Sequence, residues 1–191
     1  GFVSRFLAGE TLGARIARAP ALSTARAVLT AQCAAAMAAI HALPIAQAGT
    51  LPLRTARSQL DELARIHRGY GDTLAIFELA FSWLHRHMPS ECEPRVVHGD
   101  FRNGNLIVVE QGLVAVLDWE LAHLGDPMED LGWICQRAWR FGEGALPVGG
   151  FGTREVLFGE YERVAGRAVD RAAVRFWEIL GTLKWGVICE W

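Results

Sequence analysis

The sequence contains a single lysine, Lys184, among its 19 basic residues, so almost all of its positive charge is carried by arginine. The net charge at pH 7 is −2, which gives no basic surface of the kind that binds nucleic acid. Four cysteines lie far apart with no Cys-X-X-Cys pair, and we interpret them as free thiols of a reducing, cytoplasmic environment. The composition therefore argues against a disulfide scaffold and predicts no nucleic-acid partner.

Long hydrophobic runs are also lacking. The apolar stretch 31–43 is short and rich in alanine, and it contains Gln32 and His41, so we do not expect it to cross a membrane. The length of 191 residues suits one or two domains with an ample core. These observations predict a globular protein without a membrane partner.

Helical periodicity dominates the first half of the chain. Leu74, Phe77, Phe81, Leu84 and Met88 follow one another at steps of three and four residues, which predicts a buried helical stripe. The expected helices, with their candidate N-caps in parentheses, cover residues 11–18 (Thr11), 21–43, 55–67 (Thr55) and 73–88 (Asp72 or Thr73).

The second half is expected to contain three more helices. Asp126 lies at an N-cap position before Pro127, and Asp170 lies at another. We predict loops at 119–127 and 141–152. The expected helices cover 128–140, 153–164 and 170–191, the last with a deeply buried face formed by Val174, Trp177, Ile179, Leu180, Leu183, Val187 and Ile188.

The centre of the chain is a predicted hairpin. The apolar runs 106–109 and 113–117 flank a short turn that contains Gly112, which is typical of two buried antiparallel strands. A polar loop with Asp100 and Asn105 precedes the first strand, and Asp118 ends the second. The hairpin therefore brings two carboxylates and an amide towards one end of a small sheet.

This set of side chains suits phosphoryl transfer. That reaction needs an acceptor for the proton of the substrate hydroxyl, ligands for Mg²⁺ and positive charge around the transferred group. Asp100 is placed to face the hydroxyl, while Asn105 and Asp118 offer the hard oxygen ligands that Mg²⁺ prefers.

The same residues carry a family resemblance. His98-Gly99-Asp100, with Asn105 five positions after the aspartate, and then Leu117-Asp118-Trp119-Glu120, resemble the aminoglycoside phosphotransferase-like family of small-molecule kinases. Gly125-Asp126-Pro127 and Asp130-Leu131-Gly132 fit that family as well. The resemblance implies a predominantly helical α+β chain with a protein-kinase-like fold.

The resemblance also implies roles for individual residues. Asp100 would be the catalytic base, and Asn105 and Asp118 would be the Mg²⁺ ligands. His98 and Asp130 would support the catalytic loop. Backbone groups from Arg5 to Leu7 would meet the nucleotide at a hinge, with ATP as phosphate donor and a small-molecule hydroxyl as acceptor.

One part of the family pattern has no counterpart here. The family's phosphate-binding lysine lies in an N-terminal lobe, whereas Lys184 lies in the last expected helix. We therefore expect residues 1–10 to be a hinge strand, predicted as extended over 1–7, that remains from a missing N-terminal lobe. Residues 11–191 would be the C-terminal lobe, with the catalytic and metal-binding hairpin at 96–120. Alone, it would bind ATP weakly and turn over little, and apolar surface near Phe2, Phe6 and the hairpin would favour self-association.

The acceptor depends on regions expected to surround the catalytic loop, 55–90 and 119–152. The run 119–127 resembles the phosphotransferase domains associated with acyl-CoA dehydrogenases, which favours a hydroxyacyl-type acceptor. The glycine-rich run 149–153 is interpreted as a flexible loop or as part of an acceptor entrance, because no strand and lysine accompany it as in a phosphate-binding loop.

Three other functional interpretations compete with this one. The chain would be a non-catalytic, kinase-like binding module if it retained only the fold. A metal-dependent hydrolase would use His98, Asp100, His123 and Asp126, but that leaves Asn105 and Asp118 without a purpose. His85, His87 and Cys92 form a weak metal candidate, since residues two apart face different sides of a helix.

Overall fold

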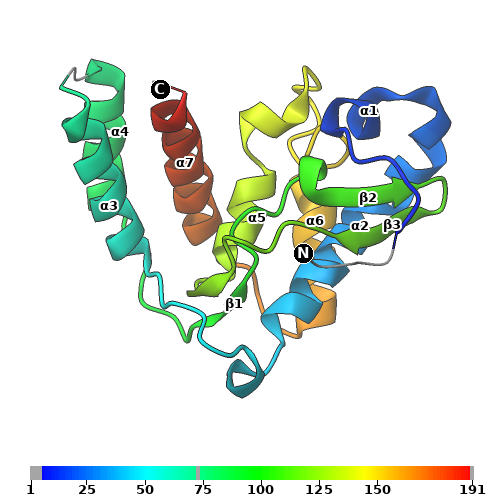
Figure 1. Ribbon diagram of the computed structural model, residues 1–191, viewed down its shortest axis with the longest axis horizontal. Helices are drawn as coiled ribbons and strands as arrows, with labels where there is room; N and C mark the ends of the chain where they lie inside the picture. Colours follow the sequence, from blue (N-terminus) through cyan, green and yellow to red (C-terminus); the bar gives the residue numbers. More distant parts are fainter. Residues whose placement is uncertain (1–5, 72–73, 190–191) are drawn as a thin grey trace.

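The computed structural model describes residues 6–71 and 74–189, and most of them are helical (Figure 1). The helices are α1 (Gly13–Arg18), α2 (Ser23–His41), α3 (Ala56–Gly69), α4 (Ala75–Arg86), α5 (Met128–Ile134), α6 (Arg154–Ala165) and α7 (Arg171–Ile188). The strands are β1 (Arg95–Val97), β2 (Leu106–Val109), β3 (Gly112–Val116) and β4 (His123–Gly125). The helix-rich α+β prediction is confirmed.

Side-chain caps fix several of the predicted helix starts. The Thr55 hydroxyl accepts a hydrogen bond from the Ser58 amide, Thr153 caps α6, and Asp170 accepts from two amides at the start of α7. The expected cap at Thr11 is wrong. The Glu10 carboxylate instead accepts from the Thr11 and Leu12 amides, and α1 begins at Gly13. The caps predicted at Asp72 or Thr73 lie outside the described residues.

The predicted hairpin is present as the antiparallel pair β2–β3, in which Leu106 faces Val116 and Val109 faces Gly112. A register irregularity between Ile107 and Val108 lets the two strands differ in length by one residue. The residues of β2 are mostly buried, while Val114 on β3 is exposed.

A second sheet was not predicted. β1 and β4 pair in antiparallel fashion, with Val96 facing Leu124, although residues 119–127 were expected to be a loop. Strands of three residues are too short to show an alternating pattern, so only the tertiary pairing reveals them. Leu124 also exchanges backbone hydrogen bonds with Pro52 and Arg54 in the connection before α3.

α5 is shorter than predicted and ends at Ile134 rather than at residue 140. A turn at Cys135 and Gln136 interrupts it, and a 3-10 helix follows over Arg137–Arg140. Phe141 then takes the left-handed conformation at φ 47°, which ends the helical path.

The segment before α1 differs from the expected hinge strand. Phe6 and Leu7 lie in irregular backbone, Phe6 is 88% exposed, and Arg5 lies outside the described residues. Pairing begins later, where Glu10 and Val108 exchange two backbone hydrogen bonds. This segment therefore meets the hairpin at Glu10.

The glycine-rich segment after α5 is irregular but packed, which corrects the expectation of a flexible loop. Val148 and Phe151 are buried, and the Gly149 carbonyl accepts a hydrogen bond from Asn103. A Cβ at Gly152 would lie 1.8 Å from the Thr30 hydroxyl oxygen, so the backbone approaches α2 closely. Residues 148–152 therefore belong to the core.

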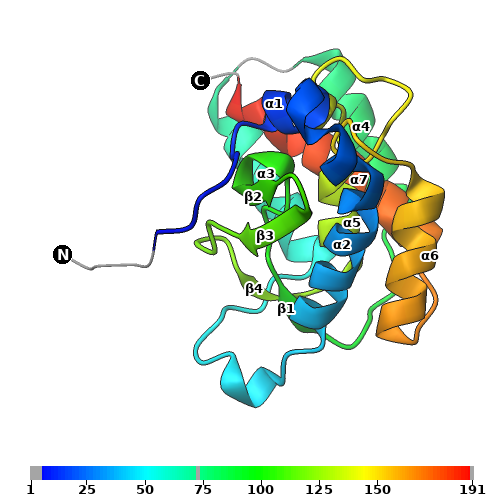
Figure 2. The same ribbon diagram turned by 90° about the vertical axis from the view of Figure 1, so that its right-hand side faces the viewer.

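The helices form two groups (Figures 1 and 2). α2 packs against α6 and β3, while α7 packs against α5 and also contacts α3 and α4. Phe81 and Leu84 of α4 are buried as predicted, whereas Leu74 is 46% exposed. The predicted face of α7 is buried except for half-buried Ile179 and exposed Ile188. No helix in the described parts of the chain is long and apolar enough to cross a membrane.

Candidate active site

The loop between β1 and β2 is held by Asp130 of α5. The buried carboxylate accepts hydrogen bonds from the His98 amide and the Gly99 amide, each at 2.9 Å. Gly99 has φ 80°, and a Cβ there would lie 2.5 Å from the Leu121 carbonyl oxygen, so glycine is required. The His98 Nε2 lies 2.9 Å from the Leu117 carbonyl oxygen and ties the loop to the end of β3.

Two further residues, which the sequence analysis missed, complete the support of Asp130. His41 at the end of α2 places Nε2 3.0 Å from Asp130 Oδ2, and its Nδ1 lies 2.8 Å from the Tyr161 hydroxyl on α6. Burial alone would raise the pKa of Asp130, but the hydrogen bond and charge of His41, together with His98, outweigh it and lower that pKa. Tyr161 is buried, and desolvation raises its pKa to about 12. The only sequence signal was a histidine at the end of an alanine-rich stretch.

The Asp100 carboxylate is fixed from three sides. The Trp133 indole Nε1 donates to Oδ1 at 2.7 Å, the Asn105 amide donates to Oδ2 at 2.6 Å, and Arg102 Nε lies 3.1 Å from Oδ1. Only 13% of the Asp100 side chain remains accessible. The sequence analysis found Asp100 and Asn105 but missed Trp133 and Arg102. Trp133 lies on α5, 33 residues away, and leaves no local pattern, whereas Arg102 is only two residues from Asp100 and could have been noticed from the sequence.

Asn105 and Asp118 lie at neighbouring positions across the hairpin. The Leu117 amide donates to the Asn105 carbonyl at 2.8 Å, and Asp118 is the next residue. Asp118 is exposed and has φ 64°, a left-handed conformation that non-glycine residues rarely adopt and that often marks functional sites. The Asn105 amide nitrogen is used on Asp100, which leaves its amide oxygen as a candidate ligand.

These donors suit a hard cation. An amide oxygen and an exposed carboxylate are the ligand types of Mg²⁺, which keeps most of its water and needs few protein ligands. Among the residues that the structure describes, no three His, Cys, Asp or Glu side chains gather in a way that could hold a metal ion. The site therefore fits a Mg²⁺ bound jointly with a phosphorylated ligand better than a closed zinc centre.

The hydrolase cluster is not assembled. His123 Nε2 lies 3.1 Å from the buried Glu129 carboxylate. Burial works to lower the pKa of His123, but the hydrogen bond and charge of Glu129 raise it overall. Asp126 accepts a hydrogen bond from the Met128 amide at the start of α5, as a helix cap does. Its other carboxylate oxygen accepts from the Trp177 indole of α7.

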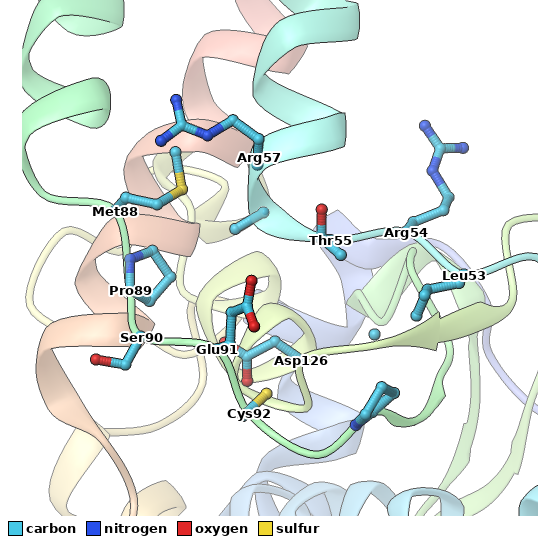
Figure 3. A pocket seen from close by; sticks show the side chains of 13 residues that line it. Leu53, Arg54, Thr55, Arg57, Met88, Pro89, Ser90, Glu91, Cys92 and Asp126 are labelled. Carbon is cyan, nitrogen blue, oxygen red and sulfur yellow. The ribbon is translucent and has the colours of Figure 1, made fainter.

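The candidate site at His85, His87 and Cys92 is not assembled either. His85 contacts Arg57, and the His87 ring stacks on Trp83 at 4.0 Å between centroids. A separate cavity of about 530 Å³ lies between the start of α3 and residues 88–94, with Arg57, Glu91 and Asp126 in its lining (Figure 3). None of the predicted phosphotransfer residues lines that cavity.

Comparisons with known proteins identify the family of the chain. Residues 2–167 match the sequence profile of the phosphotransferase enzyme family. The chain is 42% identical over 65 residues to acyl-CoA dehydrogenase family member 10 of Mus musculus, covering 33% of the chain and 6% of that protein. It is 31% identical over 121 residues to an aminoglycoside 3'-phosphotransferase of Escherichia coli, covering 58% of the chain and 44% of that protein.

Solved structures share the fold. The aminoglycoside phosphotransferase APH(3'')-Id of Streptomyces rimosus superposes with a TM-score of 0.63 at 19% identity, covering 93% of this chain and 67% of that one. The macrolide 2'-phosphotransferase type I gives a TM-score of 0.63 at 21% identity, covering 87% of this chain and 55% of that one. The chain thus spans less than half of the curated relatives it matches here.

Proposed function

Because the chain belongs to the phosphotransferase enzyme family, we propose that the protein transfers a phosphoryl group from a nucleotide to the hydroxyl of a small molecule. The observation that carries this proposal is the Asp100 carboxylate, held by Trp133, Arg102 and Asn105. The exposed Asp118 follows Leu117, whose amide donates to the Asn105 carbonyl. A fixed carboxylate next to candidate metal ligands meets the main demands of this reaction.

Asp100 acts on the acceptor. Its carboxylate orients the acceptor hydroxyl and takes its proton as the hydroxyl oxygen bonds to the γ-phosphorus. The bond from that phosphorus to the bridging oxygen breaks, and the nucleoside diphosphate leaves. Trp133 and Asn105 keep the carboxylate in one orientation, so little reorganisation is needed during transfer.

Asn105 and Asp118 would hold Mg²⁺. When bound, the ion would neutralise charge on the phosphates of the nucleotide. His98 and Asp130 are positioning residues. The Asp130 carboxylate holds the His98 and Gly99 amides at 2.9 Å, and the His98 ring contacts the Leu117 carbonyl. We propose ATP as the phosphate donor. A solved 2''-phosphotransferase with the same fold is a complex with GDP and kanamycin, which supports a nucleotide as donor without distinguishing ATP from GTP.

The nucleotide clamp is proposed to lie largely outside these 191 residues. The only lysine is on α7, and Leu7 precedes the Glu10–Val108 pairing as irregular backbone. We propose that residues 1–10 act as a hinge beside an N-terminal lobe and that residues 11–191 form the C-terminal lobe. The 191 residues alone would then bind ATP weakly and turn over little. Turnover by the purified chain at rates typical of kinases would contradict this proposal.

The test of the function is the Asp100→Asn variant in a protein that joins these residues to an N-terminal lobe of the family. Loss of the proton acceptor is expected to reduce phosphoryl transfer about 10²–10⁴-fold, with nucleotide affinity nearly unchanged. Asp61→Asn on the exposed face of α3 is the matched control. Unchanged turnover in Asp100→Asn would refute the assigned role.

Self-association and a cytoplasmic location complete the proposal. Phe6, Leu117 and Trp119 are exposed near the hairpin, which leaves apolar surface for another copy or an adjoining lobe. Size-exclusion chromatography of the 191 residues is expected to show a concentration-dependent dimer, and a monomer at all concentrations would count against it.

A further inference from the structure

A group of aromatic rings lies beside the Asp100 carboxylate. Trp133 and Trp139 have ring centroids 5.8 Å apart, and Trp139 and Trp185 lie 4.9 Å apart in an edge-to-face arrangement. We name Trp133, Trp139 and Trp185 the tryptophan wall. Trp133 reaches Asp100 directly through its indole N–H at 2.7 Å, so the wall begins at the catalytic carboxylate.

Two cations cover this wall. The Lys184 ammonium lies 5.1 Å from the centroid of the Trp133 ring, and the Arg102 guanidinium lies 4.9 Å from that of Trp139. Both distances are within the range of a cation–π interaction. One indole ring therefore separates the single lysine of the sequence from Asp100.

Lys184 differs from Arg102, Arg140 and Arg154 in having no carboxylate partner in the part of the chain that the structure describes. Arg102 is paired with Asp100, and Arg140 and Arg154 are paired with Glu178. Within residues 6–71 and 74–189, no carboxylate oxygen lies within 4.0 Å of the Lys184 ammonium. A half-buried lysine whose ammonium lies on an aromatic face, with three donors and no acid beside it among the described residues, is suited to receive an anion from a ligand.

We propose that the acceptor is a negatively charged hydroxy compound whose anionic group binds Lys184 while its hydroxyl meets Asp100. This inference rests on the proposed phosphotransfer and names its acceptor class. Trp185, the residue after Lys184 on α7, is 38% exposed and offers an aromatic surface to the apolar body of such a compound. A hydroxycarboxylate with an aliphatic chain matches all three features. A polyamine acceptor of the aminoglycoside type would place like charge against Lys184.

The experiment compares three probes that share one skeleton: a hydroxydecanoate, its primary amide and the corresponding amino alcohol. The protein used is the one that joins these residues to an N-terminal lobe of the family, here called the lobe-complemented protein. Binding is measured by ligand-observed NMR, and phosphoryl transfer from Mg²⁺·ATP is measured separately. The carboxylate is expected to bind about tenfold more tightly than the amide, as a charge-assisted hydrogen bond implies. The amino alcohol is expected to bind most weakly.

Variants then assign the preference to one side chain. Lys184→Gln should reduce the affinity for the carboxylate about tenfold and leave that for the amide unchanged, whereas Lys184→Arg should keep most of the preference. Arg163→Gln removes an exposed cation on α6 and serves as the control.

The outcomes separate the two proposals. Three outcomes would overturn the proposal that Lys184 binds the anionic group of the acceptor. They are equal binding of all three probes, no binding of any probe, and a preference for the acid that survives in Lys184→Gln. Transfer to the amide or the amino alcohol in preference to the acid also overturns it, while the phosphotransfer proposal stands. Lys184-dependent binding of the acid without transfer to any probe supports the charge preference and counts against the phosphotransfer proposal.

Discussion

The Asp130→Asn variant tests whether the catalytic loop depends on one buried charge. Asp130 is fully buried, and its two oxygens accept from the His98 amide, the Gly99 amide and His41. Asparagine has nearly the same volume but replaces one oxygen with a donor. In either orientation of the amide, at least one N–H group then faces another N–H group.

The magnitude follows from these contacts. A hydrogen bond to a charged group contributes about 1.5–3 kcal/mol, and breaking a buried charge pair costs about 3–5 kcal/mol. We expect Asp130→Asn to lower the free energy of unfolding by about 3 kcal/mol. For a chain of this size, that corresponds to a fall in melting temperature of roughly 6–12 °C.

The assay is urea unfolding followed by circular dichroism, with hydrogen exchange at the His98 and Gly99 amides as a local measurement. Both amides should exchange faster in the variant, because they lose their acceptor. Asp61→Asn, an exposed substitution on α3, should change the free energy of unfolding by less than about 0.5 kcal/mol. An Asp130→Asn protein with the urea midpoint of the wild type would refute the reasoning.

The lowered pKa of Asp130 also predicts the direction in which the stability of the protein changes with pH. The pKa of Asp130 is lower in the folded protein than in the unfolded chain, so the unfolded chain binds its proton first on acidification. The stabilisation is therefore complete above about pH 4 and is lost as the pH falls through the folded pKa. The stability difference between wild type and Asp130→Asn should accordingly shrink in acid, and a constant difference would contradict the assignment.

Three further changes test other contacts. Trp133→Phe keeps an aromatic ring but removes the N–H donated to the catalytic carboxylate, and kcat of the lobe-complemented protein should fall about tenfold with little change in KM; equal kcat would show that the bond is dispensable. The raised pKa of His123 depends on Glu129, so its contribution to stability is present below about pH 6.5 and lost as the pH rises through the folded pKa; NMR titration should show a lower His123 pKa in Glu129→Gln. Gly152→Ala places a methyl group against the Thr30 hydroxyl and should cost about 1–3 kcal/mol of stability, partly restored by Thr30→Ala.

The sequence predicted the long elements because their signals are local. The hairpin was recognisable from two apolar runs around Gly112, and α3, α6 and α7 from caps such as Thr55 and Asp170. The β1–β4 pair was missed because each strand has only three residues, and its burial depends on partners far along the chain.

The candidate site divides in the same way. Asp100, Asn105 and Asp118 belong to one strand–turn–strand unit, so their spacing could be read from the sequence. The support of Asp130 by His41 and Tyr161 could not, since 89 residues separate His41 from Asp130 and 120 separate it from Tyr161. Such contacts exist only once α2, α5 and α6 have packed.

The pairing of Glu10 with Val108 makes the segment before α1 mechanically continuous with the hairpin. Two short backbone hydrogen bonds, at 2.8 and 3.0 Å, join Glu10 to the middle of β2. A Cβ at Gly9 would lie 2.4 Å from the Ile107 side chain, so the backbone at Gly9 packs closely against β2. A displacement of the backbone ahead of Glu10 is therefore expected to shift Val108, three residues from Asn105. The backbone ahead of α1 is therefore coupled to the strand that directly follows Asn105.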